Sequence, residues 1–166
     1  MSILVDENTN LLVQGITGHI GKIQTKYMLD AGTNVTAGVA PGRGGKIIHG
    51  VPVYDTVQEA SNQHHLDATV LFVPPHVARE SVIEAVKAGI KLIFLITEHT
   101  PVHDVMEMKT YVEENNALLI GPTTPGIITP GECKIGILPQ NLFTPGPVGI
   151  VSRSGTLSYE VAANLS

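Results

Sequence analysis

The sequence predicts an α/β fold built on a parallel sheet with helices on both faces. Three observations lead to this prediction. Short apolar runs recur along the chain, segments of helical length separate them, and a glycine-rich turn joins the first run to the first helical segment. Strands that are buried on both faces consist of nearly continuous apolar residues, and they alternate with helices in parallel sheets.

Six apolar runs are expected to form strands, and four helical segments separate the first five of them. In chain order, the expected strands are 11–13, 35–39, 68–73, 92–96, 117–120 and 148–151. The expected helices are 20–31, 57–63, 77–88 and 102–115. Gly32 and Gly89 follow two of these helices, at the position where a left-handed turn commonly ends a helix.

The region from 121 to 147 interrupts this alternation. It contains six prolines, which remove backbone donors, so we expect a connecting loop there. The strand 148–151 and the helix start that follows it cannot bury both of their faces alone. We therefore expect residues 148–166 to begin a second α/β domain, after a first domain over 1–121 and a connection over 122–147. The alternative is an added strand of the first sheet with a docked terminal helix.

The composition is that of a folded chain, and it excludes several classes of function. Of the 166 residues, 43% are hydrophobic and 15% are charged, as in globular domains. The single cysteine, Cys133, excludes an intramolecular disulfide and a cysteine-based metal site. A net charge of −5 with ten dispersed basic residues predicts no nucleic-acid partner.

The sequence also predicts neither a membrane span nor export. The longest apolar stretches, such as 90–96, fall far short of the roughly 20 residues that cross a bilayer. The first six residues lack the basic segment and the long apolar run of a secretory signal, and no transit peptide is evident. A cytoplasmic location is expected, or the mitochondrial matrix if the source is eukaryotic.

A phosphate site is expected where the first strand ends. Gly15, Gly18 and Gly21 form a G-x-x-G-x-x-G loop that opens a helix. The glycines let a phosphate approach the backbone, the Thr17 hydroxyl and the first-turn amides can donate, and the helix dipole favours an anion. The alternative is a tight turn without a ligand, but the place directly after the first strand favours phosphate binding.

The loop after the second strand narrows the choice of nucleotide. An NAD site normally has an acid about 20 residues beyond the glycine loop, yet none occurs between Asp30 and Asp55. Arg43 and Lys46 stand there instead, in a glycine-rich loop. Because the arginine fork binds phosphate through two hydrogen bonds, a phosphorylated ribose of NADP or coenzyme A (CoA) is indicated. The alternative is a solvated arginine in a mobile loop.

Two other groups are candidate ligand contacts. Thr97 and Glu98 follow the strand 92–96, so they are expected at the carboxyl edge where open α/β sheets bind ligands; capping of the next helix is an equal alternative. Hydroxyls and amides around Ser154 form a second possible anion site at a helix start, and an N-cap role explains Ser154 equally well. The seven histidines show no metal-ligand spacing, so no metal site is predicted.

Together these motifs resemble the α subunit of succinyl-CoA synthetase along essentially the whole chain. The blocks that carry the resemblance include 14–18, 41–45, 96–98, 129–136 and 149–160. The resemblance implies a Rossmann-like CoA-binding domain followed by the start of a flavodoxin-like ligase domain. It also implies an acid–thiol ligase of the tricarboxylic acid cycle. That ligase interconverts succinyl-CoA, a nucleoside diphosphate and phosphate with succinate, CoA and the triphosphate through a phosphohistidine.

The resemblance assigns roles to particular positions. The residues that it places at the CoA molecule are Thr17, Gly18, His19, Ile20, Arg43, Ile96, Thr97 and Glu98. Those that it places at the substrate or at the interface with a β subunit are Thr123, Thr124 and Tyr159. Those that it places at a helix start facing the phosphohistidine are Ser154, Gly155 and Thr156. Magnesium and ADP or GDP are expected on the β subunit.

Three departures from the family are visible. The family usually has lysine at position 43, and arginine keeps that charge. The family's Gly-Pro-Asn segment becomes Gly121-Pro122-Thr123, which leaves the identity of the carboxylic acid open. None of the seven histidines stands in the family's Gly-His-Ala-Gly-Ala segment, so this chain alone should be inactive, with no catalytic residue of its own.

Two alternative functions remain at this stage, and one further association is expected. An NADP-dependent oxidoreductase would use the same glycine loop and Arg43, with Glu98 as its only apparent acid or base. A CoA-binding module without chemistry fits a chain that ends at Ser166.

The terminal helix carries an apolar stripe at three and four spacings (Leu157, Val161, Ala162 and Leu165). We expect it to pack on the first domain or on a second copy of the chain.

Overall fold

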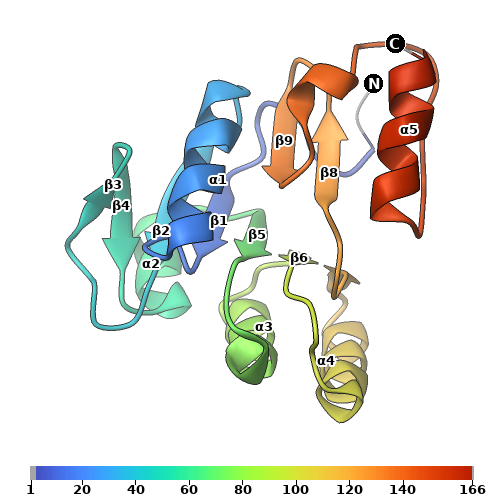
Figure 1. Cartoon of the computed structure of the whole chain (residues 1–166). Coiled ribbons are helices and arrows are strands. Elements are labelled where there is room, and N and C mark those ends of the chain that lie inside the picture. The colour runs from blue at the N-terminus through green and yellow to red at the C-terminus, as the bar shows by residue number, and fades with distance from the viewer. Residues whose placement is uncertain (1–2, 166) are drawn as a thin grey trace.

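A computed structural model describes residues 3–165 and confirms the α/β class. Its main sheet has seven strands in the order β3-β4-β2-β1-β5-β6-β7 (Figure 1). Neighbouring strands are parallel throughout, except that β3 is antiparallel to β4. The strands are β1 (Leu11–Gln14), β2 (Val35–Val39), β3 (Ile47–Ile48), β4 (Val51–Tyr54), β5 (Ala68–Leu71), β6 (Leu92–Leu95) and β7 (Leu118–Ile120).

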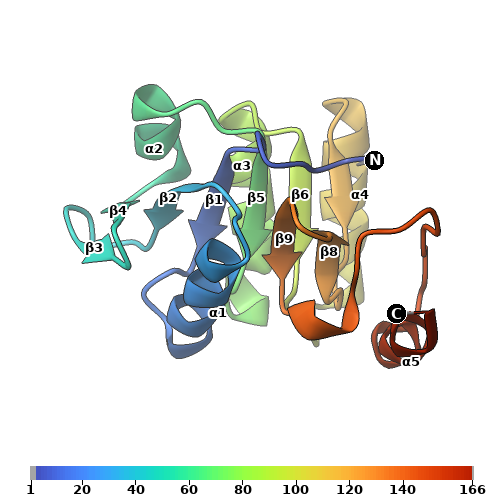
Figure 2. The same cartoon turned by 90° about the horizontal axis from the view of Figure 1, so that it is seen from above.

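Helices cover both faces of this sheet, as expected. One face carries α2 (Val57–Gln63), α3 (Ala78–Lys87), which follows a short 3-10 turn at Pro75–Val77, and α4 (Val102–Glu114). The other carries α1 (His19–Asp30) and a two-stranded antiparallel sheet of β8 (Gly126–Thr129) and β9 (Cys133–Gly136) (Figure 2). Each face has its own buried cluster, and the second unites β1, α1 and β9. Gly32 and Gly89 have φ of 86° and 92°, which confirms the left-handed helix ends.

Strand order reverses direction beside β1. The chain proceeds from β1 through β2 to β4 on one side, and then returns to place β5 on the other side of β1. In open α/β sheets, ligands bind outside the carboxyl ends of the strands at such a switch point. The fold therefore places the glycine loop after β1 where a ligand is expected.

The prediction of a loop throughout 121–147 is wrong for residues 126–136, which form the β8–β9 hairpin. Pro125 and Pro130 lie just outside β8, so they remove no hydrogen bond from the pairing. Thr33, at the end of α1, holds the hairpin: its hydroxyl donates to the Lys134 carbonyl (2.7 Å) and accepts from the Lys134 amide (2.9 Å). Ile135 is fully buried. Packing against α1 thus makes a hairpin from a proline-rich segment.

The prediction of a strand over 148–151 is also wrong. This segment pairs with no strand among the described residues, and Val151 is fully exposed. The predicted helix does form, as α5 (Gly155–Leu165); Ser166 lies outside the described residues. α5 lies at the periphery and contacts the 3-10 turn at Gln140–Leu142 (Figure 1). Apolar character alone therefore did not make a strand of this segment.

Docking of the whole apolar stripe of α5 on the first domain is likewise wrong. Ala162 is buried, but Leu157, Val161 and Leu165 are 64%, 48% and 57% exposed.

Within residues 3–165, no helix combines the length and apolarity needed to cross a membrane.

The exposed stripe of α5 should cause reversible self-association. Burial of apolar side chains against a second copy removes them from water, at about 25 cal/mol per Å². Sedimentation velocity should show a sedimentation coefficient that rises with concentration in the micromolar range. A Leu157→Glu/Val161→Glu variant should remain monomeric, and Thr156→Glu, on the same exposed helix, serves as the control. A wild-type monomer at every concentration would contradict this expectation.

Candidate functional site

The glycine loop closes tightly between β1 and α1. Gly15 has a φ of 77°, and a Cβ there would lie 2.4 Å from the Phe72 carbonyl oxygen. A Cβ on Gly21, in the first turn of α1, would lie 2.2 Å from the Gly15 carbonyl oxygen. Gly18 is the N-cap of α1 and provides no side-chain hydrogen bond. The first-turn amides of α1 therefore rely on water or a ligand as acceptor.

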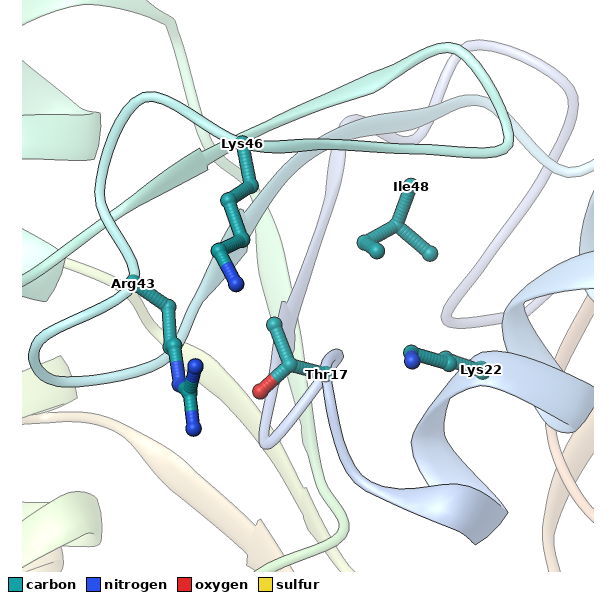
Figure 3. A pocket seen from close by; sticks show the side chains of 5 residues that line it. All are labelled: Thr17, Lys22, Arg43, Lys46 and Ile48. Carbon is teal, nitrogen blue, oxygen red and sulfur yellow. The ribbon is translucent and has the colours of Figure 1, made fainter.

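Three cationic side chains converge on this loop. Thr17, Lys22, Arg43, Lys46 and Ile48 line a cavity of about 250 Å³. Figure 3 shows Arg43 and Lys46 extending from the loop after β2, and Lys22 facing them from α1 across Thr17. No acid contributes to this lining. In a chain of net charge −5, this local excess of positive charge suits an anion, and phosphate in particular.

Hydrogen bonds hold the loop walls of the cavity. The carboxylate Oδ1 of Asp55 accepts from the backbone amides of Arg43 and Gly44, both at 2.8 Å. At the β3–β4 turn, the Nε2 atom of His49 lies 3.1 Å from the Lys22 carbonyl oxygen of α1. The cavity is therefore lined by segments that are tied to β4 and to α1.

The predicted site residues fall into two groups in space. Thr17 and Arg43 line the cavity, and Gly18, His19 and Ile20 form the adjoining start of α1. Ile96, Thr97 and Glu98 do not line it. They follow β6, which β5 separates from β1. The cavity accordingly joins the glycine loop to Arg43, and the second group lies farther along the carboxyl edge of the sheet.

The residues after β6 connect the ends of neighbouring strands. The Thr97 hydroxyl donates to the Val73 carbonyl (2.7 Å), and the Thr97 carbonyl accepts from the Thr123 amide (3.1 Å). The alternative role of Thr97 and Glu98 as helix caps is wrong, because α4 begins at Val102 with Pro101 as its N-cap. Glu98 is exposed.

The helix start at Ser154 lies beside Pro125. A Cβ on Gly155 would lie 3.5 Å from Pro125, which follows Thr124, and Thr124 Oγ1 accepts from the Gly126 amide (3.2 Å). Ser154 Oγ accepts from the Leu157 amide (3.3 Å), so the N-cap interpretation is confirmed. Thr156 follows in the first turn. Tyr159 is half-buried, and this burial raises the pKa of its phenol.

Sequence reasoning missed two residues that line the cavity and one that holds its loop. Lys22 and Ile48 had no motif to mark them, and Asp55 was noted only as the next acid after Asp30. The position of Lys22 directly after Gly21 is the one available signal, because the first turn of the helix faces the loop. Among residues 3–165, no group of three or more His, Cys, Asp or Glu side chains suits a metal ion.

Thr123 has an unusual backbone conformation, and replacing it by asparagine should stabilise the chain. Its φ is 58°, a region that β-branched residues strongly disfavour and that asparagine tolerates. Thr123→Asn should raise the free energy of unfolding by about 1 kcal/mol. Denaturant unfolding measures this, with Thr124→Asn as a control at a residue without a positive φ. A Thr123→Asn variant no more stable than wild type would show that the threonine is not strained.

Comparison with known proteins agrees with this geometry. The CoA binding domain family matches residues 6–99, a range that contains all five cavity residues and the segment 96–98. The chain is 54% identical over 166 residues to succinate–CoA ligase [ADP-forming] subunit alpha 2 of Archaeoglobus fulgidus. It is 48% identical over the same length to the corresponding alpha subunit of Staphylococcus epidermidis. All of this chain is covered, but it spans only 58% and 55% of those relatives.

A solved structure shares the fold over nearly the whole chain. ATP citrate lyase from Methanothrix soehngenii, in complex with citrate and coenzyme A, superposes with a TM-score of 0.83 at 27% identity. The match covers 97% of this chain and 29% of that one. The resemblance to the ligase α subunit is confirmed in sequence, and the Rossmann-like fold is confirmed in structure. The family match spans more than half of the chain and includes the glycine loop, Arg43 and the cavity between them, so the chain belongs to the CoA binding domain family.

Proposed function

We propose that this chain is the CoA-binding part of the α subunit of a succinate–CoA ligase, and that its cavity binds the phosphates of CoA. The observation that carries the proposal is the convergence of Lys22, Arg43 and Lys46 on the glycine loop. The identity to ADP-forming ligase α subunits over the whole chain supports the same assignment.

The two parts of the cavity suit two parts of the ligand. The amides of the α1 start and the Thr17 hydroxyl would hold the diphosphate, where the helix dipole favours negative charge. Arg43 and Lys46 would hold the ribose 3′-phosphate, and the guanidinium fork of Arg43 can make two hydrogen bonds to it. Ile48 offers an apolar contact for the nucleoside.

The second group of residues would lie along the path of the thiol. Ile96, Thr97 and Glu98 continue the carboxyl edge from the cavity toward Thr123 and Thr124, and the Thr97–Thr123 hydrogen bond joins these segments. In this assignment the CoA thiol attacks an acyl phosphate near Thr123, and phosphate leaves. Ser154, Gly155 and Thr156, at the start of α5, would face the phosphorylated histidine of the ligase.

Other components of the reaction are assigned outside this chain. Magnesium and the nucleotide would bind a β subunit, with Tyr159 near the interface. The names of the two relatives support ADP as that nucleotide. The acid is proposed to be succinate, although threonine at position 123 replaces the asparagine of the family. The expected cytoplasmic location stays a prediction.

Calorimetry with three ligands tests the proposal. CoA should bind the wild-type chain roughly 10- to 150-fold tighter than dephospho-CoA, because the 3′-phosphate gains charged hydrogen bonds. NADP should bind more weakly than CoA. Equal affinity for CoA and dephospho-CoA would contradict the role of Arg43. Tighter binding of NADP would favour the oxidoreductase alternative.

The stand-alone binding module is the second alternative, and the mass of the native protein separates it from the ligase. A native protein that contains this sequence together with a Gly-His-Ala-Gly segment would support the ligase subunit. A native chain of 17.6 kDa would favour the module.

A further inference from the structure

Asp55 binds the loop that presents Arg43, and it is not among the residues that line the cavity. It follows β4, and its carboxylate accepts two backbone amides from the tip of the loop that presents Arg43. We infer that Asp55 is a positioning residue of the CoA site. It holds the loop 40–46 in the conformation that turns Arg43 and Lys46 into the cavity, and so sets the preference for a phosphorylated ribose. This inference rests on the proposed function.

The base and the tip of this loop are held differently. At the base, main-chain hydrogen bonds join it to β4: the Ala40 amide to the Tyr54 carbonyl (3.0 Å) and the Gly45 amide to the Val53 carbonyl (2.9 Å). At the tip, residues 41–44 are exposed. The Arg43 amide donates to the Ala40 carbonyl (3.0 Å) within the loop, and the two bonds that tie the tip to Asp55 Oδ1 are each 2.8 Å long. Since charge-assisted hydrogen bonds are roughly twice as strong as neutral ones, the carboxylate is well suited to fix the tip.

Gly44 fits closely against this carboxylate. A Cβ at position 44 would lie 2.7 Å from Asp55 Oδ2. The absence of a side chain at Gly44 is therefore what lets the carboxylate reach both amides. The two positions form a matched pair, although neither contacts the cavity.

Asp55 is itself fixed by the start of α2. Its backbone amide donates to Glu59 Oε2 (3.1 Å), and the Glu59 amide donates to Oγ1 of Thr56, the N-cap of α2 (3.1 Å). This arrangement resembles a capping box, which fixes the entry of a chain into a helix. Asp55 thus links the loop tip to the start of α2, a helix that packs on the sheet. This link should restrict the motion of the exposed loop.

The negative charge of Asp55 is unfavourable close to a bound phosphate, because like charges repel. Its two possible effects on binding therefore have opposite signs. If Asp55 acts only through its charge, its removal should tighten CoA binding. If it positions the loop, its removal should weaken binding of CoA while leaving dephospho-CoA nearly unchanged.

Two substitutions separate these effects. Asp55→Ala removes both the charge and the acceptor, whereas Asp55→Asn removes the charge and keeps an acceptor oxygen. Calorimetry should show that Asp55→Ala lowers the preference for CoA over dephospho-CoA by roughly tenfold, and that Asp55→Asn retains it. Gly44→Ala, whose methyl group displaces the carboxylate, should resemble Asp55→Ala. An unchanged preference or tighter CoA binding in Asp55→Ala would overturn the inference.

A measurement without ligand separates the inference from the proposed function. Amide hydrogen exchange at Gly44 should be faster in Asp55→Ala than in wild type, and Asp55→Asn should restore much of the protection. The Arg43 amide, which also donates to the Ala40 carbonyl (3.0 Å), should change less. Unchanged exchange would overturn the positioning role even if the wild type prefers CoA. If the wild type shows no preference for CoA over dephospho-CoA, the proposed function fails. Faster amide exchange in Asp55→Ala would then still support the conclusion that Asp55 holds the loop.

Discussion

Gly21→Ala is expected to destabilise the chain by about 3 kcal/mol and to abolish CoA binding, because overpacking of this kind forces the backbone to shift. The added Cβ would meet the Gly15 carbonyl oxygen at 2.2 Å and the Ile16 Cα at 3.1 Å. Both are backbone atoms, so no side-chain rotation relieves the clash. The glycine loop and the first turn of α1 must separate, and the phosphate site opens with them. Denaturant unfolding and calorimetry measure the two losses.

Gly18→Ala is the matched control for this experiment. Gly18 has a φ of −68°, which any residue adopts, and its Cβ would lie 3.3 Å from the same carbonyl oxygen. The loop needs to yield by only a few tenths of an ångström, so the fold should persist with a loss of roughly 1 kcal/mol or less. Equal stability of Gly21→Ala and wild type would show that the loop is not as tightly closed as the structure indicates.

Arg43→Ala should weaken CoA binding by about 1.5 to 3 kcal/mol, the range for a hydrogen bond to a charged group, or roughly 10- to 150-fold in affinity. Dephospho-CoA should lose little, because it lacks the phosphate that the guanidinium is expected to contact. Alanine keeps the backbone amide that donates to Asp55 (2.8 Å), so the loop should be retained. The ratio of the two dissociation constants, measured by calorimetry, is the readout.

Two further variants control for charge alone. Arg153→Ala removes an exposed arginine from the segment before α5 and should leave both affinities unchanged. Arg43→Lys keeps the charge but loses the planar fork, so it should fall between wild type and Arg43→Ala. An equal loss of CoA and dephospho-CoA in Arg43→Ala would instead place the guanidinium at the diphosphate.

The elements that could be predicted are those whose consecutive residues show a clear pattern of apolar side chains. β2 and α2 match their expected ranges, because β2 is a nearly continuous apolar run and the α2 segment has helical spacing. The β8–β9 hairpin could not be predicted, since its partner Thr33 lies 101 residues from Lys134. The run 148–151 is the converse case, an apolar segment that pairs with no strand among the described residues. The local pattern of residues indicates which structure a segment favours. Contacts with residues distant in the sequence decide whether that structure forms.

The candidate site divides in the same way. Gly15, Thr17 and Arg43 could be predicted, because a phosphate site places glycines and cations at fixed points of the chain after the first two strands. Lys22, Ile48 and Asp55 could not, because they enter the site through the spatial approach of α1, β3 and β4. The proposed ligand path toward Thr123 also depends on the order of strands, which the sequence alone left open.

The attachment of the β8–β9 hairpin to α1 bears on protein engineering. The Gly136 amide contacts Met28 Sδ (3.4 Å), and Cys133 and Ile135 share the cluster that contains Phe94. A graft that stops at the end of β7 would expose the sulfur of Met28 and the part of this sheet face that the hairpin covers beside α1. A transplantable binding cassette therefore has to extend through Leu138, which is itself buried. The segment from the end of β7 through Leu138 would have to be included for stability, although it contributes no atom to the phosphate cavity.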